Sequence, residues 1–208
     1  MTRPRASRTL ENSIRRYGYV HVAGVDEVGR GCLAGPVVAA AVILKPECYV
    51  VGVADSKVLT AEDRERLFDG ICGAAVSWHV AIVDPAEIDR INIHRASLQA
   101  MREAILSLVP LPGFVLVDGF KVPDLLMPQR PIIHGDRRST AIAAASILAK
   151  VTRDRLMTEL HARDPRYGFD QHKGYATKAH LDAVGRFGYS PVHRRTFRPP
   201  SLFDTIPD

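Results

Sequence analysis

Short hydrophobic runs recur along the chain and alternate with longer amphipathic stretches. Runs rich in Val, Ile and Ala predict five strands, at residues 20–26, 37–44, 77–83, 114–117 and 131–134. Residues suited to capping predict helices that start at Thr60, Asp84, Ser139 or Thr140, and Thr177. An early pair of strands followed by alternating strands and helices is typical of an α/β domain with a mixed sheet.

Two of the predicted helices have informative details. The helix that begins after Asp84 is expected to bend or restart near Asn92 and to end near Ser107. The longest helix is predicted to run to about His161, and its residues 141–149 are almost all small or apolar. A helix face with so little polar surface is expected to pack closely against the sheet.

The composition is that of one globular domain. The 208 residues are 46% hydrophobic and 25% charged, which leaves ample apolar material for a core. No hydrophobic run approaches the ~20 residues of a membrane-spanning helix, and no signal peptide is visible. Cys32, Cys48 and Cys72 have no metal-ligand spacing, so we expect free thiols in a reducing cytoplasm.

Basic residues gather toward both ends of the chain. Residues 1–16 carry a net charge of +4, residues 17–149 of −3 and residues 150–198 of +6, within a total of +5. This distribution favours a polyanion-binding protein with carboxylates in its middle, although a solvated surface with a slight basic excess would look the same. We expect residues 1–16 to be a basic N-terminal arm, either disordered or merely solubilising.

Carboxylates follow several of the predicted strands. Asp26 and Glu27 end the first, Asp118 ends the fourth, and Asp136 follows the fifth. Strand ends converge at one edge of an α/β sheet, and clustered carboxylates need a cation to neutralise them. Oxygen ligands with no competing His or Cys set favour Mg²⁺ or Mn²⁺, which in pairs support phosphoryl chemistry. Taken singly, each acid could instead be a helix cap or a turn residue.

The segment after the first strand combines acids with glycines. Because Asp26 and Glu27 are adjacent, a regular strand would point them to opposite faces, so a shared site predicts a bulge or turn. Gly29, Arg30 and Gly31 do not form a dinucleotide fingerprint, since the next glycine is misplaced and a strand follows. They form either a plain hairpin turn or a loop through which the backbone approaches a sugar or phosphate.

Three further segments suit nucleic acid, and each also has a structural interpretation. Lys57 precedes the Thr60 helix and could contact phosphate, or could lie in an ordinary loop. Residues 167–175 interleave aromatic, glycine and basic residues, among which Lys173 and Tyr175 are candidates for contact with phosphates and bases. Arg194 and Arg195 either follow a phosphate backbone or belong to a solvated tail.

Together these segments resemble one family, the type 2 ribonucleases H, or ribonuclease HII. The resemblance rests on residues 24–36 (GVDEVGRGCLAGP), 55–57 (DSK), 117–119 (VDG), 135–136 (GD), 143–150 (AAASILAK), 172–175 (HKGY) and 193–195 (HRR). These stretches run in the family's order and span roughly residues 20–197, which is nearly the whole chain.

The resemblance implies a fold and a reaction. The fold would be RNase H-like, with a mixed five-stranded sheet, flanking helices and a helical C-terminal portion. Residues 17–208 would form a single domain, with the core at about 17–162 and a substrate-binding portion at 163–208. Such enzymes cut on the 5′ side of a ribonucleotide in duplex DNA and also cut RNA–DNA hybrids, leaving a 3′-hydroxyl and a 5′-phosphate. A cytoplasmic monomer that acts in ribonucleotide excision repair would be typical.

The resemblance also assigns the site. Its catalytic, metal-binding carboxylates would be Asp26, Glu27, Asp118 and Asp136, holding Mg²⁺ or Mn²⁺. Its substrate-binding residues would include Gly29, Arg30 and Gly31 at the ribose 2′-hydroxyl and Tyr175 at the following deoxynucleotide, with Lys57, Lys173, Arg194 and Arg195 as phosphate contacts.

Two positions depart from the family's pattern, and two alternatives remain. His134 stands where the family often has Lys, and Ala141 where it commonly has Ser. Neither position is a carboxylate, so substrate affinity is more affected than activity. Another nuclease on the same fold, such as a junction resolvase, would not require a 2′-hydroxyl. A non-catalytic nucleic-acid-binding module would bind in a salt-sensitive way without turnover.

Overall fold

A five-stranded mixed sheet forms the centre of the protein. The computed structural model describes residues 6–53 and 59–197. The strands are β1 (Val22–Val28), β2 (Val37–Leu44), β3 (Ala75–Val83), β4 (Phe114–Asp118) and β5 (Gln129–Ile132), in the spatial order β3-β2-β1-β4-β5. β1 pairs antiparallel with β2, and β2 antiparallel with β3, whereas β4 runs parallel to both β1 and β5. The predicted α/β fold with a mixed five-stranded sheet is confirmed.

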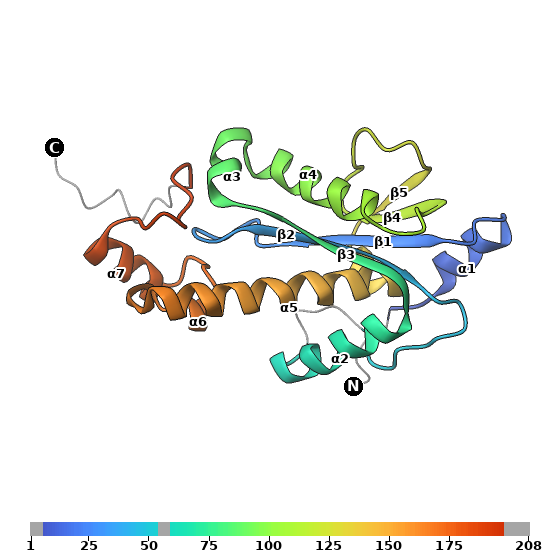
Figure 1. Cartoon of the computed structure of the whole chain (residues 1–208), viewed down its shortest axis with the longest axis horizontal. Coiled ribbons are helices and arrows are strands. Elements are labelled where there is room, and N and C mark those ends of the chain that lie inside the picture. Colours follow the sequence, from blue (N-terminus) through green and yellow to red (C-terminus); the bar gives the residue numbers. More distant parts are fainter. Residues whose placement is uncertain (1–5, 54–58, 198–208) are drawn as a thin grey trace.

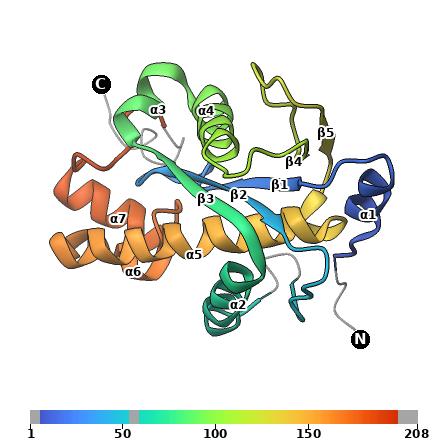
Figure 2. The same cartoon turned by 45° about the vertical axis from the view of Figure 1, so that its right-hand side comes forward.

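Helices cover both faces of this sheet (Figures 1 and 2). One face is covered by α3 (Pro85–Ile91) and α4 (Ile93–Leu106), and the other by α5 (Thr140–Arg163), with α2 (Ala61–Ala74) packed beside α5. Alternate residues of β2 enter the two hydrophobic cores, and all eight are buried. A central strand covered on both faces needs apolar side chains on both, which explains the uninterrupted hydrophobic run in the sequence.

The long helix α5 lies directly against β1. Its residues from Thr140 to Ala149 are all buried, as the small and apolar sequence predicted. A Cβ added to Gly24 of β1 would lie 2.2 Å from the carbonyl carbon of Ala141 and 2.4 Å from the backbone nitrogen of Ile142. Glycine at this position therefore lets the start of the helix rest on the strand with backbone against backbone.

The N-terminal segment is a correction to the sequence interpretation. Residues from Thr9 to Arg16 form helix α1, in which Ile14 is buried, so this stretch is not a disordered arm. Glu11 is buried as well, and its Oε1 atom accepts hydrogen bonds from the Ser139 hydroxyl (2.7 Å) and the Ala141 amide (2.8 Å). A carboxylate at the start of α5 satisfies helix amides that have no partner within the helix, which ties α1 to the domain. Residues 1–5 lie outside the described part of the chain.

The predicted helix caps are present. Each capping side chain accepts a hydrogen bond from the amide three residues on; these residues are Thr60, Asp84, Asn92, Ser139 and Thr177. Asn92 has a positive φ of 70° and separates α3 from α4, where the sequence predicted a bend or restart. After α5 come the short η3 (Pro165–Tyr167) and α6 (Phe169–His172) and then α7 (Lys178–Phe187), at the end of the molecule shown on the left of Figure 1. Among the described residues, no helix is long and apolar enough to cross a membrane.

Candidate active site

Two neighbouring strands bring the first carboxylates together. Val25 of β1 pairs with Val117 of β4 in parallel register, so Asp26 and Asp118 follow at equivalent positions. The Asp118 Oδ1 atom accepts a hydrogen bond from the Gly135 amide at 2.7 Å. This bond holds the turn that carries Asp136 beside the end of β4.

Asp136 reaches this region by a different route from the predicted one. β5 ends at Ile132, and Asp136 lies in a single 3₁₀ turn, η2 (Gly135–Arg137), just before α5. His134 precedes the turn in the left-handed conformation, with φ of 54°. The chain therefore leaves the sheet before it presents Asp136, which is buried at 5% exposure.

No bulge separates Asp26 from Glu27, contrary to the sequence expectation. The pairing of β1 with β2 continues in regular register through both residues and Val28. The two side chains therefore leave opposite faces of the strand. Asp26 faces α5 and is hydrogen-bonded with Ser146, whereas Glu27 lies 3.4 Å from the Arg30 guanidinium.

The carboxylates influence one another's charge. Burial raises the pKa of Asp26 well above its ordinary value, and the nearby charges of Glu27 and Asp118 raise it further. Burial also raises the pKa of Glu27, and the Arg30 guanidinium opposes that shift. Three acids that share a poorly solvated region repel each other, so a bound cation would stabilise their ionised forms.

The donor set fits a hard divalent cation, but the carboxylates are not assembled into a cage. Within residues 6–53 and 59–197, no three His, Cys, Asp or Glu side chains are arranged so that they could hold a metal ion together. Protein groups engage several of the oxygens: the Glu27 amide donates to Asp26 Oδ1 at 2.7 Å, and the Gly135 amide to Asp118 Oδ1. Carboxylate oxygens are the ligands that hard divalent cations prefer, and Asp26 interacts with both Glu27 and Asp118.

A buried arginine supports the loop that follows the acids. Gly29 has φ of +94°, and a Cβ there would lie 2.3 Å from Nε of Arg153, which belongs to α5 and is fully buried. The Arg153 guanidinium donates to the carbonyls of Pro36 (2.9 Å), Ala34 (3.0 Å) and Lys173 (2.8 Å). Gly29 therefore serves both its turn and this close packing. A Cβ added to Gly31 would have no atom within 4 Å.

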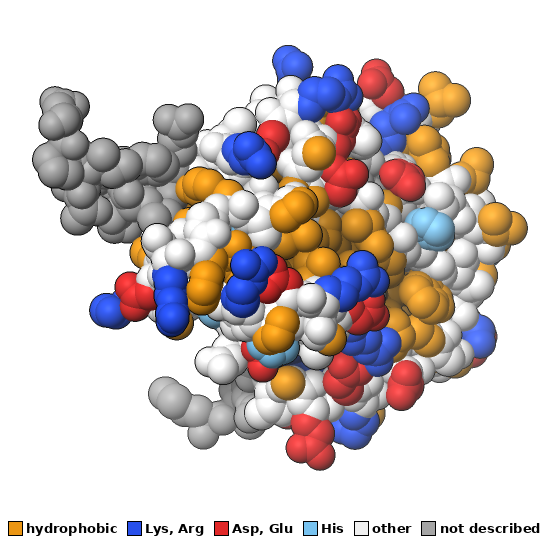
Figure 3. Space-filling model, turned by 60° about the vertical axis from the view of Figure 1, so that its left-hand side comes forward, with side chains coloured by type: hydrophobic (Ala, Val, Ile, Leu, Met, Phe, Trp, Pro, Cys, Tyr) orange, Lys and Arg blue, Asp and Glu red, His pale blue; other side chains and the backbone are white. Residues whose placement is uncertain are grey.

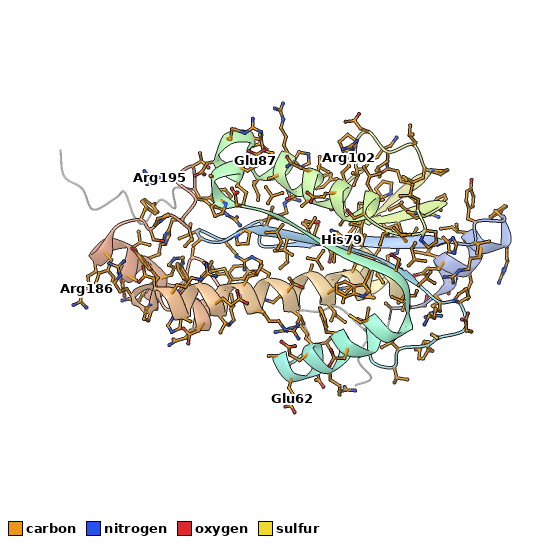
Figure 4. All side chains as sticks on the ribbon, in the orientation of Figure 1. Glu62, His79, Glu87, Arg102, Arg186 and Arg195 are labelled. Carbon is orange, nitrogen blue, oxygen red and sulfur yellow. The ribbon has the colours of Figure 1, made fainter. Side chains whose placement is uncertain are left out.

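Arg194 has a different role from the phosphate contact that the sequence suggested. It is fully buried, and its guanidinium donates twice to the Gly35 carbonyl (3.0 and 2.8 Å) and once to the Arg30 carbonyl (3.1 Å). With its donors used inside the protein, Arg194 holds the loop rather than a substrate. Arg195 is exposed, and its backbone amide donates to Asp89 of α3. Figure 4 labels Arg195 at the left of the molecule.

Tyr175 is brought beside the same loop. Cys32 forms a β-bridge with Tyr175, and Ala34 forms another with His193, so residues 32–34 lie between two C-terminal segments. The Tyr175 side chain is 40% exposed, hydrogen-bonds with Cys32, and has the Lys150 ammonium 5.9 Å from its ring centre. The predicted neighbours Tyr175 and Gly29-Arg30-Gly31 thus share one region.

The remaining predicted contacts are less concentrated. Lys173 is half-buried and donates to the Thr158 hydroxyl at 2.9 Å, while Lys57 lies outside the described residues. Figure 3 shows basic and acidic side chains interspersed around a hydrophobic area on this side, not one continuous basic stripe. Sequence reasoning missed Arg153, which stands among other charged residues of the long helix and so carried no distinct signal. It also missed the buried His180, which carried no signal.

Comparison with known proteins decides the family. The family model for ribonuclease HII matches residues 23–199. This chain belongs to the ribonuclease HII family. A ribonuclease HII of Mycobacterium tuberculosis (strain ATCC 25618 / H37Rv) is 50% identical over 195 residues, which cover 93% of this chain and 74% of the relative. That of Caldicellulosiruptor saccharolyticus is 49% identical over 188 residues, covering 90% of this chain and 92% of the relative.

A solved structure agrees with the sequence relatives. Ribonuclease H2 from Pyrococcus horikoshii OT3 superposes with a TM-score of 0.72 at 27% identity, covering 86% of this chain and 94% of that one. The ribonuclease HII chain is therefore a type 2 ribonuclease H, a phosphodiester hydrolase. Neither a junction resolvase nor a non-catalytic binding module is favoured.

Proposed function

We propose that this ribonuclease HII is a metal-dependent endoribonuclease that hydrolyses the phosphodiester 5′ to a ribonucleotide in duplex DNA. RNA–DNA hybrids would be cut by the same chemistry, leaving a 3′-hydroxyl and a 5′-phosphate. The observation that carries the proposal is the interacting group of Asp26, which is buried, with Glu27 and Asp118, to which the Gly135 amide ties the Asp136 turn.

In the proposed site, Asp26, Glu27, Asp118 and Asp136 would hold Mg²⁺ or Mn²⁺, which requires their side chains to come closer together than they are in the structure. The bound metal would lower the pKa of the attacking water and stabilise charge on the leaving oxygen. The protein supports this with a rigid frame: β1 and β4 carry three of the acids, and the Gly135 amide fixes the position of the turn that carries Asp136. Strands and backbone hydrogen bonds fix the backbone from which the catalytic side chains extend.

Substrate recognition is assigned to the loop at Gly29, Arg30 and Gly31 together with Tyr175. The ribose 2′-hydroxyl is the group that distinguishes RNA from DNA, and a loop can approach it closely at glycines, which have no side chain. The open space beside Gly31 and the exposed Tyr175 ring, next to the same loop, support this assignment. Lys57, Lys173 and Arg195 would contact phosphates, and Arg194 would act indirectly by holding the loop.

The proposal extends to the oligomeric state, the location, the biological role and the division of the chain. We propose a monomer located in the cytoplasm that acts in ribonucleotide excision repair on duplex DNA containing ribonucleotides. Residues at about 17–162 would supply the catalytic core and residues 163–208 the substrate-binding portion.

The test is cleavage of a labelled DNA duplex that contains one ribonucleotide, with Mg²⁺ or Mn²⁺. An all-DNA duplex and the variant Asp136→Asn serve as controls. We expect a single cut 5′ to the ribonucleotide that disappears with EDTA and in the variant. Salt-sensitive binding without any cut would contradict the proposal, and cutting of both duplexes would contradict the 2′-hydroxyl recognition.

A further inference from the structure

Three histidines gather beneath Tyr175, away from the carboxylates. His180 of α7 is fully buried, His193 is 2% exposed, and His172 of α6 is half-buried. The rings of His172 and His180 stack with centres 4.3 Å apart, and those of His180 and His193 lie 5.2 Å apart. None of these rings belongs to the proposed chemistry, so their burial calls for another explanation.

The hydrogen bonds of this cluster admit one arrangement of protons. His193 Nδ1 accepts the Ser190 amide at 3.0 Å and lies 2.7 Å from the Ser190 hydroxyl, so its proton is on Nε2. That Nε2–H donates to His180 Nε2 at 3.1 Å, so His180 carries its proton on Nδ1. His180 Nδ1–H then donates to the Tyr175 carbonyl at 2.9 Å. A single chain of hydrogen bonds thus runs from Ser190 to Tyr175.

The hydrogen-bond chain joins two segments that pair with residues 32–34. These residues belong to the substrate loop (residues 29–35), which includes the proposed substrate contacts Gly29, Arg30 and Gly31. His193 forms the β-bridge to Ala34, and Tyr175 forms the one to Cys32. The Leu33 amide donates to the Gly174 carbonyl at 2.8 Å, and the Arg194 amide donates to the Leu33 carbonyl, also at 2.8 Å. The two segments pair with different residues of the loop. The hydrogen bonds from His193 to His180 and from His180 to the Tyr175 carbonyl connect the segments to each other.

We propose that His180 and His193 are positioning residues for Tyr175: as a neutral pair they hold its backbone against residues 32–34, and a proton added to either ring breaks one link of the hydrogen-bond chain and so loosens Tyr175. This rests on the proposed function, in which Tyr175 contacts substrate. A second proton on His180 would go to Nε2 and place two N–H groups opposite one another at the 3.1 Å contact. A second proton on His193 would go to Nδ1 and place an N–H opposite the Ser190 amide.

The surroundings keep the pair neutral at ordinary pH. Burial lowers the pKa of His193 to about 4, with the charge of His180 acting in the same direction, and burial lowers the pKa of His180 and of His172 too. The Asp164 carboxylate opposes the shift at His193, but it is engaged by Arg166 at 2.8 Å. The other titratable or charged side chains around the three rings are His161, Tyr167, Asp170, Lys173 and Tyr189. We therefore expect this loosening in acid and not near neutral pH.

The experiment is a double-mutant cycle between His180→Ala and Tyr175→Ala, with kcat/KM measured on the single-ribonucleotide duplex. Each single variant is expected to lose about tenfold, the effect of one effective hydrogen bond or contact. The double variant should lose no more than about twofold beyond Tyr175→Ala, because His180 acts only through Tyr175. His79→Gln on β3, far from α7 in Figure 4, is the matched histidine control and should leave the rate unchanged.

Conservative variants and a spectrum complete the test. His193→Gln retains an N–H toward His180 and should keep more activity than His193→Asn, which is too short to reach it. Nitrogen-15 NMR of the unmutated protein should show His180 protonated on Nδ1 and His193 on Nε2 at pH 7, which needs no variant to fold. As pH falls, loss of these tautomers should parallel loss of kcat/KM.

The outcomes separate the two proposals. Independent, multiplicative losses in the cycle, or the opposite tautomers in the spectrum, would overturn the positioning role while leaving the enzyme assignment intact. An unmutated protein that does not cut at a ribonucleotide overturns the proposed function. Unchanged cleavage by Tyr175→Ala overturns the role of Tyr175 and the positioning role with it, although cleavage itself persists.

Discussion

Replacing Arg153 by Met should destabilise the fold strongly, although Met is of similar length and would be well suited to a buried position. Arg153 donates to three buried carbonyls, those of Pro36, Ala34 and Lys173. A buried polar group left without a partner costs about 1–3 kcal/mol. Against that loss, the variant no longer buries a guanidinium charge, which offsets part of the cost. The expected decrease in the free energy of unfolding is therefore about 2–5 kcal/mol.

Urea unfolding at pH 7, followed by circular dichroism, measures this decrease directly. Arg153→Lys should fall between the unmutated protein and Arg153→Met, since an ammonium can serve some of the carbonyls but not all three. Arg102→Met, on the exposed side of α4 (Figure 4), is the matched control and should change the free energy by less than about 0.5 kcal/mol. A decrease below about 1 kcal/mol for Arg153→Met would refute the reasoning, because the three carbonyls would then be satisfied in some other way.

Three more predictions follow from the site and its supports. Asp26→Asn should lower kcat on the ribonucleotide-containing duplex by roughly a thousandfold or more. The same variant should raise the melting temperature at pH 7, because a raised carboxyl pKa means that ionisation at neutral pH opposes folding; a lower melting temperature would contradict the repulsion. Gly24→Ala should destabilise the protein by about 3 kcal/mol or more in urea unfolding, since its Cβ would overlap the Ala141 backbone at 2.2 Å, whereas Gly73→Ala, with open space around it, should not. Because the pKa of His193 is lowered from 6.5 to about 4, its contribution to stability is complete above pH 6.5 and is lost as pH falls toward 4; His193→Gln should remove this part of the pH dependence in unfolding curves measured between pH 4 and 7.5.

Local signals predicted most of the framework. The caps at Thr60, Asp84 and Thr177, and the apolar run at residues 141–149, depend on neighbouring residues, and the structure has each of them. Parallel pairing of two predicted strands was enough to place Asp26 beside Asp118.

Contacts between distant segments were beyond these signals. The sequence favoured a surface position for Arg194. Its partners are the backbone carbonyls of Arg30 and Gly35, and every residue has a carbonyl, so residue types could not indicate them. The role of Glu11 was not predicted because it stands among basic residues near the N-terminus. Its partner, the amide of Ala141, lies far along the chain. The bulge expected at Glu27 assumed that both carboxylates must leave one face, whereas the end of a regular strand allows the two to interact around its edge.

The support of the substrate loop from distant residues has a consequence for synthesis of the chain. The four carboxylates are all made by residue 136, but the guanidiniums that hold the loop come at Arg153 and Arg194. A ribosome therefore releases every acid well before the last support for residues 29–35 exists. Translation that stops, or proteolysis that cuts, between residues 175 and 192 would leave a fragment that retains the acids and Arg153 but lacks Arg194. The order of synthesis thus makes the complete support of residues 29–35 the last part of the site that the growing chain acquires.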